Sequence, residues 1–277
     1  MTEPEPITDR SPYGPRMFGV ERPTAARLYD YFLGGTSYSI ADRAVGREIE
    51  RRAPHWAIGA RLNRSYVRRV VQLMANAGID QFLDLGSGIP TGGNVHDVAR
   101  GIHPGARVVY VEKELVTFQT AQYLLEGHEA AAVINLDLRD PESVLAHPTT
   151  QGLLDLSRPV GLILVGVLLF IPPDEAQEMI QRYLRVLAPG SHVAILVITE
   201  DFTDAEVASE IDWVREQYAA TADRLYTYTP QQGRDLLAGT EPVEPGFVRH
   251  PLWRPELPPS PEQLRCGHGY VCVSRVP

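Results

Sequence analysis

The clearest chemical signal in the sequence is a glycine-rich stretch that follows a short apolar run. Residues 83–94 read Leu-Asp-Leu-Gly-Ser-Gly-Ile-Pro-Thr-Gly-Gly-Asn. Gly86 and Gly88 let the backbone take positive φ in a turn and approach a ligand closely. A dinucleotide fingerprint needs a third glycine where this chain has Thr91. The stretch by itself therefore indicates a nucleoside site, and its neighbours must decide which nucleoside.

An acid stands two residues before the first of these glycines. This residue, Asp84, lies where a pyrophosphate would be repelled and an ammonium group attracted. The carboxylate therefore favours a nucleoside that carries an amino acid over nicotinamide or flavin dinucleotides.

Two further acids follow apolar runs downstream. Glu112 ends the run 108–111, 24 residues after Gly88, and a carboxylate at such a strand end can accept both ribose hydroxyls. Asp137 follows the run 133–136 and can accept from an adenine amino group. The alternatives are an exposed strand-end glutamate and a solvated turn aspartate. Asp140, which precedes a proline, is expected to cap the next helix instead.

From residue 81 onward, short apolar runs alternate with amphipathic segments, and the elements they predict would bring these residues together. This alternation is typical of βαβ units and a parallel sheet. We expect an α/β fold with a Rossmann-like, seven-stranded, mostly parallel sheet and helices on both faces. The expected strands are 81–85, 107–111, 131–136, 160–165, 192–198, 246–249 and 269–274. The expected helices between and after them are 95–101, 115–126, 174–187, 203–222 and 230–238.

The N-terminal part follows a different pattern. Residues 1–22 are rich in proline and polar residues and are expected to form a flexible arm. Residues 23–78 are expected to form a helical cap, with helices over 23–33, 40–52 and 55–76. Residues 79–277 then form the Rossmann-like core, which makes a single domain with the cap.

Composition limits the classes of partner. The net charge of −9 argues against nonspecific nucleic-acid binding, which needs clustered Lys and Arg. No apolar run approaches the roughly 20 residues that span a bilayer, and the N-terminus lacks the apolar core of a signal peptide. Cys266 and Cys272 are the chain's two cysteines, so a reducing compartment is expected and a disulfide framework is not. We predict a cytoplasmic protein with no membrane or nucleic-acid partner and no metal site.

In these motifs the chain resembles the class I S-adenosylmethionine-dependent methyltransferases. Within that class it is similar to an actinobacterial group of S-adenosyl methyltransferase proteins once classed as a domain of unknown function. The matching segments are 25–35, 41–43, 61–64, 81–96, 107–112 and 137–141. The resemblance runs from about residue 23 to the C-terminus and implies S-adenosylmethionine as cofactor.

The resemblance also implies roles for individual residues. Gly86 and Gly88 would contact the methionine and ribose portions, Glu112 the ribose hydroxyls, and Asp137 with the Leu138 amide the adenine. An arginine of the cap, Arg64, could pair with the cofactor carboxylate. The full set of expected cofactor-binding residues is Tyr29, Tyr38, Arg64, Asp84, Gly86, Ser87, Gly88, Thr91, Asn94, Glu112, Lys113, Asp137 and Leu138. Asp30 and Asn63 are further cap residues expected to help close the site.

A catalytic base is not evident. The segment 171–174 reads Ile-Pro-Pro-Asp and lacks the Asn or Asp and the aromatic residue that amino-directed enzymes place there, so an oxygen, sulfur or carbon nucleophile on a small molecule is favoured. The resemblance implies a histidine, common in that group, at the position where this chain has Leu169. The sequence therefore predicts a methyltransferase acting on an unidentified small molecule, with a non-catalytic protein that binds S-adenosylmethionine or S-adenosylhomocysteine for regulation as the alternative. Trp213 and Tyr218 are expected to pack in the core or to line a substrate pocket. The oligomeric state is left open.

Overall fold

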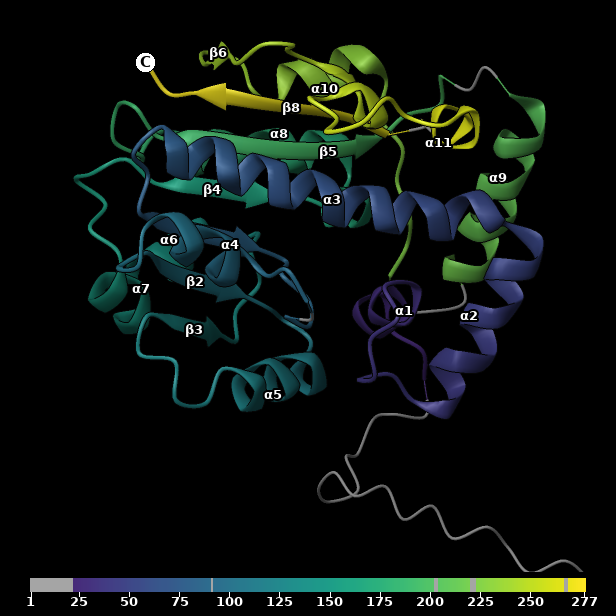
Figure 1. The fold of residues 1–277 in the computed structure, drawn as a ribbon, viewed down its shortest axis with the longest axis horizontal. Coiled ribbons are helices and arrows are strands. Elements are labelled where there is room, and N and C mark those ends of the chain that lie inside the picture. Colours follow the sequence, from purple (N-terminus) through teal and green to yellow (C-terminus); the bar gives the residue numbers. More distant parts are fainter. Residues whose placement is uncertain (1–21, 91, 202–203, 220–222, 267–268) are drawn as a thin grey trace, which may run out of the picture.

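The computed structural model describes residues 22–90, 92–201, 204–219, 223–266 and 269–277. It is built around one eight-stranded sheet, in the order β3-β2-β1-β4-β5-β8-β6, with β7 also paired to β8 (Figure 1). The strands are β1 (Gln81–Leu85), β2 (Arg107–Val111), β3 (Ala131–Ile134), β4 (Gly161–Leu164), β5 (His192–Ile198), β6 (Glu241–Pro242), β7 (Val248–Arg249) and β8 (Gly269–Arg275). The pairs from β3 to β5 are parallel, and β8 runs antiparallel to β5, β6 and β7.

The central strands are buried on both faces, which explains their nearly continuous apolar sequence. Neighbouring residues point to opposite sides, so Phe82 belongs to one apolar cluster and Leu83 to the other. The same alternation separates Ala194 from Val193 and Ile195 along β5. Each face of the sheet therefore packs against its helices through a separate apolar core.

The longer helices are α1 (Ala25–Phe32), α2 (Ile40–Arg52), α3 (Pro54–Asn76), α4 (Val95–Ile102), α5 (Leu115–Leu124), α8 (Pro173–Leu184) and α9 (Ala205–Ala219). The short ones are α6 (Pro141–Ala146), α7 (Pro148–Leu153), α10 (Pro230–Asp235) and α11 (Pro261–Arg265), with 3₁₀ turns η1 (Leu168–Phe170) and η2 (His250–Leu252). Buried residues of α3 and α4 pack in the cluster that contains Phe82, and those of α6 and α8 in the cluster that contains Leu83. None of the helices within the described ranges is both long and apolar enough to span a bilayer.

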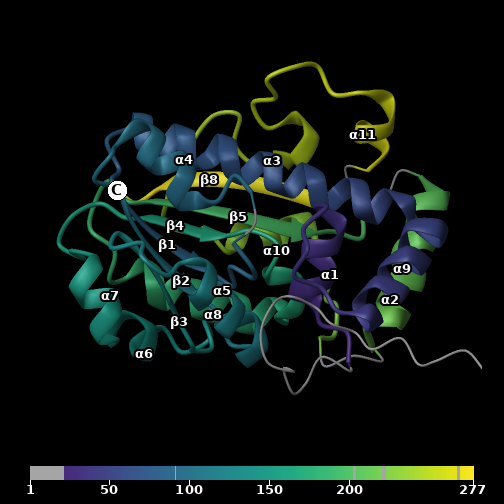
Figure 2. The ribbon, with the colours of Figure 1, turned by 60° about the horizontal axis from the view of Figure 1, so that its bottom comes forward.

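The N-terminal helices have two roles. The long helix α3 packs against α4 and lies along β4 and β5, so it forms part of the layer that covers the sheet (Figure 1). Helices α1 and α2 lie beyond the end of the sheet, beside α9 (Figure 2). A buried ion pair joins α1 to α2, with Arg27 Nε 2.6 Å from Asp42 Oδ2. The same Asp42 completes a capping box with Ser39 at the start of α2.

A second buried contact fastens α3 to α9. Glu210 accepts from the His55 backbone N–H at 3.1 Å, and its other oxygen lies 2.8 Å from His55 Nδ1. Both side chains are nearly inaccessible to solvent. The apolar face of α9, with Val207, Ile211 and Val214, is buried in the same cluster as α3, and the pair adds a polar contact to that packing.

Removing the Glu210 carboxylate should therefore lower stability measurably. We expect Glu210→Ala to reduce the free energy of unfolding by about 2 kcal/mol, because it leaves buried donors of His55 without an acceptor. Urea denaturation followed by circular dichroism measures the change. Asp212→Ala on the exposed side of the same helix is the matched control and should change stability by less than about 0.5 kcal/mol. Equal losses in the two variants would contradict this account.

The predicted fold class is confirmed, with differences in detail. Strands β3 and β4 are shorter than expected, and the added strand β6 makes the sheet eight-stranded rather than seven-stranded. The short helices α6 and α7 were not predicted, although Asp140 caps α6 as expected, accepting from the Ser143 N–H at 3.1 Å. Residues 1–21 of the predicted arm 1–22, Thr91, and the ends of the predicted helix 203–222 lie outside the described residues.

Candidate functional site

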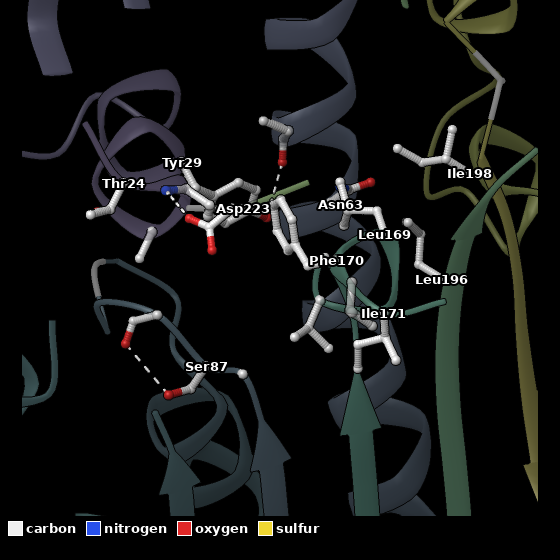
Figure 3. A pocket seen from close by; sticks show the side chains of 18 of the residues that line it. Thr24, Tyr29, Asn63, Ser87, Leu169, Phe170, Ile171, Leu196, Ile198 and Asp223 are labelled. Atoms are coloured by element: carbon white, nitrogen blue, oxygen red, sulfur yellow. Dashed lines mark hydrogen bonds between the residues drawn. The ribbon is translucent and has the colours of Figure 1, made fainter. Parts of the chain in front are cut away.

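A cavity of about 440 Å³ opens at the carboxyl ends of β1, β2 and β4, beneath α1 (Figure 3). Parallel sheets bind ligands at this edge because the loops that leave the strands converge there. One part of its lining carries the polar loops, with Gly86, Ser87, Gly88, Glu112, Lys113, Asp137 and Leu138; we call it the polar compartment. The other part, which we call the apolar compartment, is lined by Phe32, Trp56, Leu169, Phe170, Leu196, Ile198 and Tyr218.

The turn after β1 depends on glycine. Gly86 has φ +69° and Gly88 has φ +63°, a region that favours glycine over other residues. The Gly86 N–H donates to the Val111 carbonyl at 2.9 Å, which fastens the turn to the end of β2. A Cβ at Gly86 would lie 2.3 Å from Val167 Cγ2, so this position has no room for a side chain.

Glu112 joins the turn to the next loop. It follows β2, is buried, and accepts from the Gly88 N–H at 3.1 Å and from the Glu114 N–H at 2.8 Å. Burial raises the pKa of Glu112 against the lowering effect of these two hydrogen bonds. Each carboxylate oxygen can accept a further bond, so Glu112 can hold two vicinal hydroxyls.

Asp137 lies at the far side of the polar compartment, after β3. Its carboxylate is paired with Arg139, whose Nη2 lies 2.5 Å from Asp137 Oδ2. Burial raises the pKa of Asp137, but the hydrogen bonds from Arg139 outweigh it and lower the pKa overall. Asp137 therefore stays ionised and can accept from an amino group, while the neighbouring Leu138 is buried against the cavity.

A third charged group lies behind the glycine turn. Burial raises the pKa of Asp84 to about 7, against the attraction of the nearby Arg64 guanidinium and with repulsion from Glu112. The Arg64 guanidinium lies over the Tyr29 ring at 5.8 Å, and its buried Nε has no hydrogen-bond partner among the described residues. The Asp84 carboxyl and the Arg64 guanidinium thus lie beside the turn, and the Arg64 Nε–H can donate a further hydrogen bond.

The structure brings most of the predicted residues together. Tyr29, Gly86, Ser87, Gly88, Glu112, Lys113, Asp137 and Leu138 line the cavity. Asp84 and Arg64 stand behind its wall, and Tyr29 donates to the Ala60 carbonyl at 3.3 Å. Asn63 also lines the cavity, as does Tyr218.

Four expected residues are placed elsewhere. Tyr38 packs edge-on against Tyr31, outside the cavity lining. Asn94 begins α4 and donates to Asp97 at 3.2 Å. Asp30 is buried and accepts from the Ser37 N–H, so it shapes the connection between α1 and α2. Trp213 packs against the apolar cluster that contains Phe82, which is one of its two expected roles, and the Arg52 guanidinium lies over its ring.

Sequence patterns missed several lining residues. Asp223, which follows α9, and His250, in η2, both line the cavity. Burial lowers the pKa of His250 to about 4, so its imidazole is neutral. Neither residue lies in a recognisable motif, because the fold brings each to the cavity from a separate part of the chain.

Comparison with known proteins agrees with this geometry. The family profile described as S-adenosyl methyltransferase matches residues 13–276. A protein of Mycolicibacterium vanbaalenii, provisionally assigned as an S-adenosyl-L-methionine-dependent methyltransferase, is 27% identical over 180 residues, 58% of this chain and 55% of that protein. The matched stretch thus spans about half the length of this curated relative.

Two solved structures are similar over nearly their whole length. A provisionally assigned methyltransferase of Thermobifida fusca YX is 35% identical with a TM-score of 0.85, covering 93% of this chain and 97% of that one. A DUF574 family protein of Streptomyces avermitilis MA-4680 is 33% identical with a TM-score of 0.84, covering 93% and 99%. The chain belongs to the S-adenosyl methyltransferase family.

Proposed function

We propose that the chain is an active S-adenosylmethionine-dependent methyltransferase whose acceptor is a small molecule. The observation that carries this proposal is a single cavity that joins a polar compartment, suited to an amino-acid-bearing nucleoside, to an apolar compartment lined by aromatic and aliphatic side chains. Membership of the family supports the cofactor.

The residues present fit this cofactor. In the proposal, Glu112 accepts from the ribose hydroxyls and Asp137 from the adenine amino group. Arg64 and Asp84 do not line the cavity, so we assign them to the methionine end by charge alone: the Arg64 guanidinium attracts the carboxylate, and the Asp84 carboxylate attracts the ammonium group. Gly86 and Gly88 allow the backbone to approach the ligand without side chains in the way. Ser87, Lys113 and Leu138 complete the lining.

The bound cofactor supplies an electrophilic methyl group on a sulfonium. The protein then has to align an acceptor with that group and to exclude water. Val167 and residues Leu169 to Ile171 line the cavity just after β4, and Val167 lies next to the glycine turn, so they give the cavity an apolar wall close to that turn. These apolar side chains and helix α1 are suited to excluding water from the cavity rather than to acid–base chemistry.

The size and position of the cavity support a small acceptor. Its volume lies near the lower end of the roughly 300–1,000 Å³ typical of small-molecule pockets, and it must also hold the cofactor. Helix α1 and its N-cap Thr24 form one side of the cavity and contribute Thr24, Ala25, Ala26, Tyr29 and Phe32 to the lining (Figure 3). The net charge of −9 does not favour a nucleic acid as the acceptor.

Calorimetric titration with S-adenosylmethionine, S-adenosylhomocysteine and NAD tests the cofactor. We expect both adenosyl ligands to bind with micromolar or tighter dissociation constants and NAD not to bind. Incubation of the protein with methyl-labelled cofactor and fractionated metabolite extracts then tests turnover. Tight cofactor binding with no labelled product in any fraction would favour the non-catalytic alternative, and NAD binding alone would overturn the proposal.

Cofactor affinity should also depend on pH through Asp84. Because the pKa of Asp84 is raised to about 7, its carboxyl is mostly protonated at pH 6 and mostly ionised at pH 8. The ionised form attracts the ammonium group, so affinity for S-adenosylhomocysteine should rise about tenfold over this range. Asp84→Asn should remove the rise, while the titration of the ligand itself remains in both proteins. An unchanged pH profile in the variant would show that another group is responsible.

A further inference from the structure

The face of α3 that lines the cavity carries an amide side chain among small and apolar residues. Trp56, Gly59, Ala60 and Asn63 all line the cavity, and their spacing places them on one side of the helix. We propose that the Asn63 carboxamide binds the methyl acceptor, and that this acceptor is an uncharged, mainly apolar small molecule with a lactam or carboxamide group. The inference rests on the proposed function, because it assigns the second ligand of the same cavity.

The Asn63 side chain has no partner within the part of the chain that the structure describes. It makes no hydrogen bond or ion pair with another described residue, and it is half-buried in the cavity lining. Figure 3 shows it extending from α3 on the side of the cavity that carries Leu169, Leu196 and Ile198. A ligand that covers this amide must therefore replace the hydrogen bonds that water gives it.

Polar side chains from other parts of the lining differ from Asn63 in this respect. Tyr29 donates its hydroxyl proton to the Ala60 carbonyl at 3.3 Å. Asp223 accepts from the Ala25 N–H at 3.3 Å, so its carboxylate is already engaged with α1. Asn63 is thus the better candidate for a polar group that a ligand can engage through both a donor and an acceptor.

The geometry of a carboxamide selects its partner. It presents N–H donors beside a carbonyl acceptor in one plane. A lactam or carboxamide presents a donor beside an acceptor in the matching order, so two hydrogen bonds can form at once. A carboxylate can only accept, and its charge would lie against the Asn63 carbonyl oxygen. The surrounding Leu169, Leu196 and Ile198 suit the apolar remainder of the ligand, because small-molecule pockets are mostly apolar with a few polar groups that fix orientation.

Three probes of nearly one shape test the assignment: 2-quinolone, quinoline and naphthalene. 2-Quinolone has a lactam N–H beside its carbonyl, quinoline has an acceptor without a donor, and naphthalene has neither. Each is titrated calorimetrically into the full chain, with and without saturating S-adenosylhomocysteine. We expect 2-quinolone to bind about tenfold more tightly than naphthalene, with quinoline between them, because each hydrogen bond to the amide adds to the affinity.

Asn63→Leu then identifies the residue responsible, since it removes both polar atoms and keeps a side chain of similar size. The preference for 2-quinolone over naphthalene should fall to less than about twofold, while naphthalene should bind at least as tightly as to the native protein. General damage to the cavity would weaken both probes instead, and a thermal melt checks that the variant is folded. Asn76→Leu, at the exposed end of the same helix, is the matched control and should leave the preference unchanged.

Failure of this inference can be told apart from failure of the proposed function. If S-adenosylhomocysteine binds but no probe binds, or the three probes bind equally, the acceptor class is wrong and the cofactor site stands. The inference is also overturned if Asn63→Leu keeps the full preference, or if saturating S-adenosylhomocysteine displaces 2-quinolone, because the two ligands would then occupy the same part of the cavity. If S-adenosylhomocysteine fails to bind, the proposed function is wrong, and the titrations without it still measure the selectivity of Asn63.

Discussion

Replacing Gly86 by alanine should lower the affinity for S-adenosylhomocysteine by at least about 1,000-fold, the largest effect we expect from a single methyl group. Two causes act together. The new Cβ would lie 2.3 Å from Val167 Cγ2, so either the turn or Val167 must move into the cavity. The left-handed φ of +69° adds about 1–2 kcal/mol of backbone strain. Calorimetric titration measures the loss.

The two causes can be separated. Gly127, between α5 and β3, also has a positive φ of +84°, but a Cβ there meets no atom within 4 Å. Gly127→Ala should therefore lower the melting temperature and leave the affinity intact. Adding Val167→Ala to Gly86→Ala removes the clashing side chain and should restore part of the affinity. Full affinity in Gly86→Ala alone would show that the turn does not approach the ligand.

Replacing Glu112 by glutamine should lower the affinity for S-adenosylhomocysteine by about 100-fold, because two hydrogen bonds from the ligand to a charged acceptor are lost or weakened. The amide also turns a donor toward either the Gly88 or the Glu114 N–H, each of which now donates to the carboxylate. Loss of these bonds would loosen the turn as well as the contact with the ribose.

A pair of ligands with and without the 2′-hydroxyl distinguishes loss of ribose recognition from a general disturbance of the site. The native protein should bind 5′-methylthioadenosine at least tenfold more tightly than its 2′-deoxy analogue, and Glu112→Gln should bind the two about equally. Asp140→Asn is a matched control, since Asp140 also follows a strand but caps α6 outside the cavity lining. A variant that still prefers the ribose form would place the hydroxyl contact elsewhere.

The sequence predicts those parts of the fold whose signals are local. Strands β1, β2 and β5 begin and end where predicted, because each consists mainly of apolar residues and is followed by a glycine or a polar residue. Helix α2 likewise has its predicted bounds, which its Ser39 capping box explains. The two-residue strand β6 has no pattern of its own and exists because Glu241 and Pro242 pair with the end of β8. Helix α6 is too short for a periodic signal.

The same distinction applies to the candidate site. Glu112 and Asp137 could be predicted because Glu112 directly follows β2 and Asp137 lies in the loop just after β3, and parallel strands end at one edge of the sheet. Asp223 could not, because its place in the cavity depends on a contact with Ala25, 198 residues away. His250 likewise lines the cavity through η2, which packs against β8 and α3. The sequence does not show that the Tyr38 ring packs edge-on against Tyr31, outside the cavity lining.

The pairing of β8 with β5 has a consequence for synthesis of the protein on the ribosome. Gly269, the first residue of β8, lines the cavity, and β8 covers the edge of β5 that carries Leu196 and Ile198. Until residues 269–275 have left the exit tunnel, β5 presents an unpaired edge and the cavity lacks one wall. A growing chain should therefore depend on chaperones or on rapid translation at this stage, and cofactor cannot stabilise it until β8 is in place.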